Sequence, residues 1–169
     1  MKVIKELTST NTTAIIYASK HGTTETVARL LAEELNDKAV LISLKENQNP
    51  DITQFEIVIL GSAIYAGTSR KEMKKFCENN KEVLQQKTIG LFICGMEPNP
   101  INRENEIKNA YPESLLQHAK ITGFLGGEFL FDKLNFLEKL IVKKVAKVTD
   151  SVSAIEKDTI ATFAKEIKS

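Results

Sequence analysis

Apolar and polar positions follow two different periods along this chain, and the alternation predicts strands and helices in turn. Short continuous apolar runs rich in β-branched and aromatic residues are typical of strands buried on both faces of a sheet. Stretches in which apolar residues recur every three or four positions are typical of amphipathic helices. The predicted strands cover 15–18, 39–44, 55–61, 88–94 and 120–131, the last range including the loop that leaves the strand. The predicted helices cover 24–36, 69–80, 103–118, 132–148 and 153–168, with a kink or break at Pro112.

This order of elements predicts a doubly wound α/β fold. Crossovers between parallel strands carry helices, so five apolar strands separated by helices indicate a parallel sheet with helices on both faces. Residues 1–12 carry no signal-peptide core and are expected to form a flexible lead-in, and residues 13–169 are expected to form a single domain. In such sheets ligands bind beyond the carboxyl ends of the strands.

Polar, glycine-bearing loops follow the first, third and fourth predicted strands, and so meet at that edge. They cover 19–24, 62–67 and 95–100. The first loop joins a buried strand to a helix through hydroxyl residues and one glycine, and the first turn of a helix has N–H groups without intrahelical partners. This combination favours binding of an anion such as a phosphate. Taken alone, the loop fits equally well the alternative that Thr23 or Thr24 only caps the helix.

Composition and charge narrow the function. The 23 basic and 22 acidic side chains give a formal net charge of +1, which argues against broad nucleic-acid binding. Cys77 and Cys94 lie far apart and form neither a zinc motif nor a disulfide framework, so we expect no metal site and a reducing, cytoplasmic compartment. No run approaches the roughly 20 apolar residues of a membrane span. Histidines and cysteines form no catalytic set, so no catalytic residue is assigned, and the oligomeric state stays open.

Two of these loops carry a family resemblance. The spacing Ser19-x-His21-Gly22-x-Thr24 after a buried strand resembles the phosphate loop of flavodoxins, Ser/Thr-x-Thr/Ser-Gly-x-Thr, and departs from it at His21. Gly61-Ser62-x-x-Tyr65-x-Gly67 resembles the second loop of that family, where an aromatic residue stacks on the flavin ring. The resemblance covers nearly all of residues 13–168. It implies a flavodoxin-like sheet of five parallel strands in the order 2-1-3-4-5, FMN as cofactor, and electron transfer as activity.

The resemblance also implies which residues bind FMN. The phosphate is expected to bind to the first loop, at Ser19, Lys20, His21, Gly22, Thr23 and Thr24. The flavin ring is expected to bind to the second loop, at Ser62, Ala63, Ile64, Tyr65, Ala66 and Gly67. The end of the fourth strand and the third loop, which lacks the family's second aromatic residue, add Cys94, Gly95, Met96 and Glu97. The alternatives are a surface tyrosine at Tyr65 and a buried, inert thiol at Cys94.

The stretch Lys133–Lys147 is both basic and unusually apolar, because five lysines oppose one glutamate around an apolar face. In one interpretation it is an ordinary helix with its lysines in water. Its packing positions on the sheet are then Leu134, Leu137, Ile141, Val145 and Val148. In the other, it is a peripheral contact with the inner face of an anionic membrane.

A narrower resemblance concerns the second half of the chain. Gly126-Gly127 before a long basic helix, followed by a final Phe163-Ala164-Lys165-Glu166-Ile167, is similar to the menaquinone-dependent protoporphyrinogen dehydrogenases. That resemblance implies an FMN-dependent oxidoreductase that works with a quinone or a redox partner protein. This sequence has Glu97, Asn99 and Asn102 where that family is rich in arginine and aromatics. His21 and the missing aromatic residue of the third loop motivate a second hypothesis, a flavodoxin-like domain without FMN that acts as a binding or regulatory module.

Overall fold

Parallel strands form the central sheet of the computed structural model, which describes residues 12–36, 38–129, 135–145 and 152–169. The parallel strands in chain order are β1 (Thr13–Ala18), β2 (Ala39–Ser43), β3 (Ile57–Tyr65), β5 (Thr88–Cys94) and β6 (Ile121–Phe124). They lie in the spatial order β2-β1-β3-β5-β6. Ile15 of β1 pairs with Leu41 on one side and Ile59 on the other. Counted among the parallel strands alone, this is the order 2-1-3-4-5, so the predicted doubly wound fold is confirmed.

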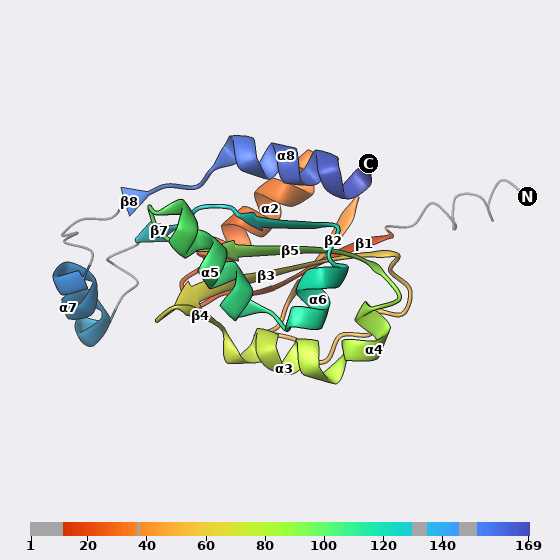
Figure 1. Ribbon diagram of the computed structural model, residues 1–169, viewed down its shortest axis with the longest axis horizontal. Coiled ribbons are helices and arrows are strands. Elements are labelled where there is room, and N and C mark those ends of the chain that lie inside the picture. Colours follow the sequence, from red (N-terminus) through yellow and green to blue (C-terminus); the bar gives the residue numbers. More distant parts are fainter. Residues whose placement is uncertain (1–11, 37, 130–134, 146–151) are drawn as a thin grey trace, which may run out of the picture.

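Helices cover both faces of the sheet (Figure 1). One face carries α2 (Thr23–Glu34) and α8 (Lys157–Lys168). The other carries α3 (Lys71–Asn79), α4 (Lys81–Leu84), α5 (Pro100–Ala110) and α6 (Glu113–His118). Because successive strand side chains point to opposite faces, Ile15 and Ile16 enter two different cores. Ile15 packs in the core that contains Phe163 of α8, and Ile16 in the core that contains Phe76 of α3.

Several helix and strand boundaries differ from the predicted ones, because backbone pairing extends some strands and adds others. The predicted break at Pro112 is confirmed by the gap between α5 and α6. The prediction of a loop over 62–65 is wrong, because β3 continues to Tyr65 and folds back into the antiparallel strand β4 (Thr68–Ser69). The predicted helix start at Ser153 is also wrong. Ser153 belongs to β8 (Val152–Ser153), which pairs with β7 (Glu128–Phe129), and α8 starts only at Lys157.

Helix α7 (Phe136–Val145) lies beyond the edge of the sheet where β3 and β5 end (Figure 1). The predicted packing of Leu137 on the sheet is wrong, since its exposed fraction is 65%. Helices α2 and α8 already cover one face of the sheet. Helix α7 instead contacts the loop that follows β1. Leu134, Val148 and the side chains of Ile141 and Val145 lie outside the described residues, as does nearly all of the expected lead-in at 1–12. Among the described residues, every helix is too short or too polar to cross a bilayer.

Candidate site at the carboxyl ends of the strands

The loop between β1 and α2 is shaped by one hydroxyl and one glycine. The Gly22 N–H donates a hydrogen bond to Ser19 Oγ at 3.0 Å, which closes the turn. Gly22 has φ 92°, a left-handed conformation that glycine adopts without the strain a side chain would bring. No side chain of the described residues caps α2, so the N–H groups of its first turn lie at a bare, electropositive helix end. The prediction that Thr23 or Thr24 caps the helix is therefore wrong, because both lie inside α2.

Thr24 carries the most informative polar atom of this loop. Its side chain is completely buried, and, apart from an interaction with the Cys94 thiol, its hydroxyl oxygen has no hydrogen-bond partner in the part of the chain that the structure describes. An unsatisfied buried hydroxyl costs about 1–3 kcal/mol. The hydroxyl lies close enough to the Cys94 thiol to offset part of the effect of burial on that thiol's pKa. A phosphate bound at the start of α2 would give this oxygen the acceptor that it lacks.

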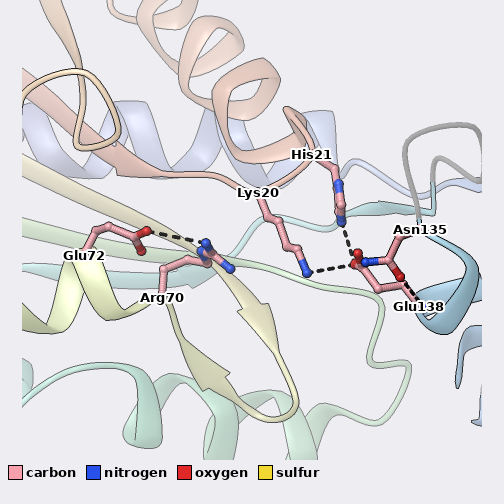
Figure 2. A network of polar contacts seen from close by, with 6 residues as sticks. All are labelled: Lys20, His21, Arg70, Glu72, Asn135 and Glu138. Atoms are coloured by element: carbon pink, nitrogen blue, oxygen red, sulfur yellow. Dashed lines mark hydrogen bonds and ion pairs between the residues drawn. The ribbon is translucent and has the colours of Figure 1, made fainter.

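Lys20 and His21 point away from the helix end and toward α7 (Figure 2). Lys20 Nζ lies 2.9 Å and His21 Nε2 2.8 Å from the same carboxylate oxygen, Oε2 of Glu138. The Glu138 N–H in turn donates to Asn135 Oδ1 at 2.8 Å, which caps the start of α7. This carboxylate therefore joins α7 to the loop after β1 across 117 residues of sequence.

Sequence reasoning missed Glu138, although a signal existed. Glu138 is the only acidic residue among the five lysines of 133–147, so its presence there is conspicuous. Its side chain is only 6% exposed. Burial raises the pKa of Glu138, but hydrogen bonds and charges from Lys20 and His21 outweigh burial and hold that pKa below its ordinary value. The carboxylate is thus a negative charge held beside Lys20 and His21.

Tyr65 lies at the end of β3, where that strand turns back into β4. It is 43% exposed at the end of β3, and Lys20 Nζ lies 4.3 Å from the centroid of its ring. The turn after it is made by Ala66 and Gly67, with φ values of 54° and 77°. An exposed ring held on a strand end and beside the first loop can stack on a flat ligand.

Other members of the second loop are committed to the protein itself. Ser62 is fully buried, and its hydroxyl accepts from the Arg70 N–H and donates to the Ala63 carbonyl, both at 3.0 Å. Ala63 and Ile64 are half-buried strand residues. Among the side chains of this loop, Tyr65 is thus the one whose position suits a flat ligand.

The third loop is held by its own turn and by a neighbouring glycine pair. The Gly95 N–H donates to the Gly126 carbonyl at 3.0 Å, and a Cβ on Gly127 would lie 2.6 Å from the Gly95 oxygen. Glu97 Oε1 accepts from the Asn99 N–H at 2.9 Å, while Asn99 caps α5. These contacts commit the side chains of Glu97 and Asn99 to shaping the loop. Half-buried Met96 and the backbone of 95–97 remain for a ligand.

The remaining predicted site residue, Cys94, is buried at the end of β5. Its exposed fraction is 3%, and burial raises the pKa of its thiol to about 12. The alternative of an inert thiol therefore describes its side chain. Glu106 of α5 is a second residue that the sequence did not single out. Its pKa is raised by burial and by the nearby Glu97, and its Oε2 is buried under the third loop without a hydrogen-bond partner among the described residues.

A polar hollow of about 160 Å³ adjoins the loop after β1. Its lining residues are Ala18, Ser19, Lys20, Lys45, Arg70 and Glu72. Arg70 and Glu72 are in contact at 3.5 Å (Figure 2). Two of its three cationic side chains are paired with carboxylates, Lys20 with Glu138 and Arg70 with Glu72. Lys45 adds positive charge next to the bare end of α2, which favours a negatively charged ligand at this edge.

Comparisons with known proteins bear on this arrangement. A family model described as "Flavodoxin domain" matches residues 14–154. Protoporphyrinogen IX dehydrogenase [quinone] of Leishmania major is 19% identical over 156 residues, which are 88% of this chain and 68% of that protein.

Solved structures share the fold. The TM-score is 0.56 to a flavodoxin of Streptococcus pneumonia TIGR4, at 18% identity over 92% of this chain and 97% of that one. It is 0.59 to an oxidoreductase of Corynebacterium diphtheriae, at 12% identity over 94% and 95% of the chains. It is 0.53 to a Fusobacterium nucleatum flavodoxin bound to flavin mononucleotide, at 15% identity over 92% and 96%. The family match runs from β1 to β8 and includes every strand of the sheet, and this chain belongs to the flavodoxin domain family.

Proposed function

We propose that this protein binds FMN and is a flavodoxin-like oxidoreductase that passes electrons between a reduced partner or substrate and a quinone or redox protein. One observation carries the proposal. Among the described residues, the buried Thr24 hydroxyl lacks a nitrogen or oxygen partner at an uncapped helix end, and Lys20 of the same loop lies 4.3 Å from the centroid of the exposed Tyr65 ring. A phosphate at the helix end and a flat ring against Tyr65 would satisfy both features.

The residues divide into those that bind and those that shape the site. The N–H groups of Thr23 and Thr24 and the Thr24 hydroxyl would hold the phosphate, while Ser19 and Gly22 fix the turn that presents them. Tyr65 and the backbone of 95–97 would hold the ring. Lys20 and His21 act through Glu138 and balance charge at the loop. Bound FMN supplies the electron-transfer chemistry, and the chain orients it and excludes water.

Thr24→Val tests the phosphate site in two directions. Valine keeps the shape of threonine but removes the hydroxyl. Loss of a hydrogen bond to a charged phosphate lowers FMN affinity about 10–100-fold. Removal of an unsatisfied buried hydroxyl raises the free energy of unfolding of the flavin-free protein by about 1 kcal/mol. Flavin fluorescence titration and chemical denaturation measure the two effects.

Thr162→Val is the matched control, because Thr162 lies in α8, is exposed and donates to the Asp158 carbonyl. We expect it to leave FMN affinity unchanged. Equal affinity of the wild type and Thr24→Val would place the phosphate elsewhere. A purified protein that is colourless and gains no flavin absorbance with added FMN would refute the proposal itself.

Protoporphyrinogen is a specific candidate substrate, proposed from the similarity to the Leishmania major enzyme. Assaying protoporphyrinogen oxidation with a menaquinone analogue as acceptor separates an enzyme from an electron shuttle. Turnover supports the enzyme. Its absence in protein that carries FMN leaves electron exchange with a redox partner protein as the function.

One contact favours the second hypothesis, a binding or regulatory module without FMN. The Glu138 carboxylate already contacts Lys20 and His21 at the loop, so the protein supplies an anion of its own there. The same absorbance measurement decides between the two, since the module predicts no flavin uptake at any FMN concentration.

We further propose that the protein works in the cytoplasm, including the inner face of the membrane. The two cysteines are free and buried, and in a reducing compartment they need no pairing.

A further inference from the structure

Helix α7 turns apolar side chains toward water. Among the described residues, the exposed large apolar side chains are Tyr65, Ile101, Phe136, Leu137 and Leu140. The last three lie within one stretch of α7, with exposed fractions of 78%, 65% and 48%. Leu140 lies three residues after Leu137 and four after Phe136, so it neighbours both on the helix surface and the three side chains form one strip. Such a strip, unlike scattered exposed residues, marks a surface that meets an apolar partner.

The anchor at Glu138 sets the orientation of α7. At about 100° per residue, positions 136 and 140 lie roughly 160° away from position 138 on the helix. The carboxylate is buried against Lys20 and His21, so Phe136 and Leu140 face away from the sheet. A helix that packs on its own domain has the opposite arrangement, with apolar residues inward and charges outward. This outward apolar face is therefore held in place by an ion pair.

The charge of α7 identifies the partner. Within Phe136–Val145, one glutamate stands against Lys139, Lys143 and Lys144, and that glutamate is already paired with the loop. Lys144 is exposed and Lys139 is partly exposed. A strip of phenylalanine and leucine beside lysines complements a layer of anionic headgroups over hydrocarbon, which is the surface of an anionic bilayer.

We propose that α7 is a membrane-docking helix that inserts Phe136, Leu137 and Leu140 among the lipids of an anionic bilayer, while Glu138 ties it to the loop after β1. Lys20 contacts both Glu138 and the ring of Tyr65, so docking places the bilayer near the candidate flavin site. The docking itself does not depend on the proposed function. Only its purpose, the delivery of electrons to a quinone dissolved in the membrane, rests on that function.

Vesicle flotation of the full chain, with FMN added, tests the docking. We expect partitioning at least about tenfold stronger into vesicles of phosphatidylcholine with phosphatidylglycerol than into phosphatidylcholine alone. Combined Phe136→Ser, Leu137→Ser and Leu140→Ser should lower partitioning at least about 100-fold. Lys139→Glu with Lys144→Glu should remove the preference for the anionic vesicles while circular dichroism stays unchanged.

Ile101→Ser is the matched control, because Ile101 is 70% exposed but lies on α5. It should bind vesicles as the wild type does. Equal binding to both kinds of vesicle, or retained binding by the triple variant, overturns the proposal. So does a chain that ignores vesicles and forms a dimer that the triple variant loses, since a second copy then covers α7. Floated protein without flavin absorbance supports docking and counts against FMN binding, so the two proposals fail separately.

Discussion

Polar side chains at the edge formed by the carboxyl ends of the strands differ in whether they already have hydrogen-bond partners within the protein. The Ser62 hydroxyl and the Glu97 carboxylate have internal hydrogen-bond partners, while the Thr24 hydroxyl has no nitrogen or oxygen partner among the described residues. A residue with satisfied polar atoms gains little from a ligand, whereas an unsatisfied one gains the full hydrogen bond. At this scale, Thr24 and Tyr65 contribute to binding, and Ser62 and Glu97 to the shape of the site.

Glu138 makes the attachment of α7 depend on pH in a defined direction. Burial raises the pKa of Glu138, but Lys20 and His21 lower that pKa by more than burial raises it. The folded-state pKa therefore lies below that of the unfolded chain. A carboxylate with a depressed pKa contributes its stabilisation above the unfolded pKa and loses it as pH falls through the folded one. The anchor therefore holds at neutral pH and is released only below the ordinary glutamate range, which lies near about 4.3.

Glu138→Gln removes this charge and keeps the size of the side chain. We expect the hydrogen-exchange protection of α7 amides to fall roughly tenfold at neutral pH, as for the loss of one charge-assisted hydrogen bond. Below the glutamate range the difference from the wild type should vanish, because the wild-type carboxyl is then protonated. Glu33→Gln, on the exposed face of α2, should change nothing. Undiminished protection in Glu138→Gln would show that other contacts hold α7.

Among the elements, the connection from β6 to α8 depends on one glycine. Gly126 has φ 84°, and a Cβ there would lie 2.1 Å from the Ala154 carbonyl oxygen. The backbone just before β7 is therefore in direct contact with the backbone just after β8. The backbone contact places α8 over the sheet, because the Glu156 N–H donates to the Leu125 carbonyl just before that helix.

Gly126→Ala and Gly67→Ala form a matched pair that separates crowding from backbone strain. Gly67 also has a positive φ, 77°, but no atom of the described residues lies within 4 Å of its Cβ position. Gly67→Ala should lower the free energy of unfolding by about 1–2 kcal/mol through strain alone. Gly126→Ala adds a clash with backbone and should lower it by at least about 3 kcal/mol. Urea denaturation measures both, and equal losses would contradict the close packing at Gly126.

At the scale of the whole molecule, the sheet separates two cores, and each core contains one free cysteine. Cys77 belongs to the core under α3 and Cys94 to the core under α2 and α8. Burial raises the pKa of each thiol to about 12. Neither thiol therefore takes part in thiolate chemistry while both cores are intact, although Cys94 lies next to the candidate site.

Thiol labelling reports on this global packing. At pH 8 the thiolate fraction of either cysteine is about 1,000-fold below that of an unfolded chain, so labelling of the native protein by a thiol-reactive disulfide should be slower by at least that factor. Denaturant should make both cysteines react together. Rapid labelling of one cysteine in the native protein would show that one core opens independently of the other.

The sequence by itself determined the class of fold, the order of elements and the three loops at the carboxyl edge. Hydrophobic periods record which faces are buried, so local pattern sufficed for β1, α2 and the break at Pro112. The residues of the first loop were also local, since Ser19 and Gly22 contact each other.

Only the tertiary structure decided what lies far apart in sequence. The carboxylate of Glu138 meets Lys20 and His21 across more than a hundred residues, and no periodicity encodes such a pairing. The β3–β4 hairpin and the β7–β8 pair depend on backbone hydrogen bonds, which side-chain pattern does not reveal. The direction in which α7 faces follows from its ion pair and not from its apolar residues, so a hydrophobic pattern read alone placed Leu137 on the wrong side.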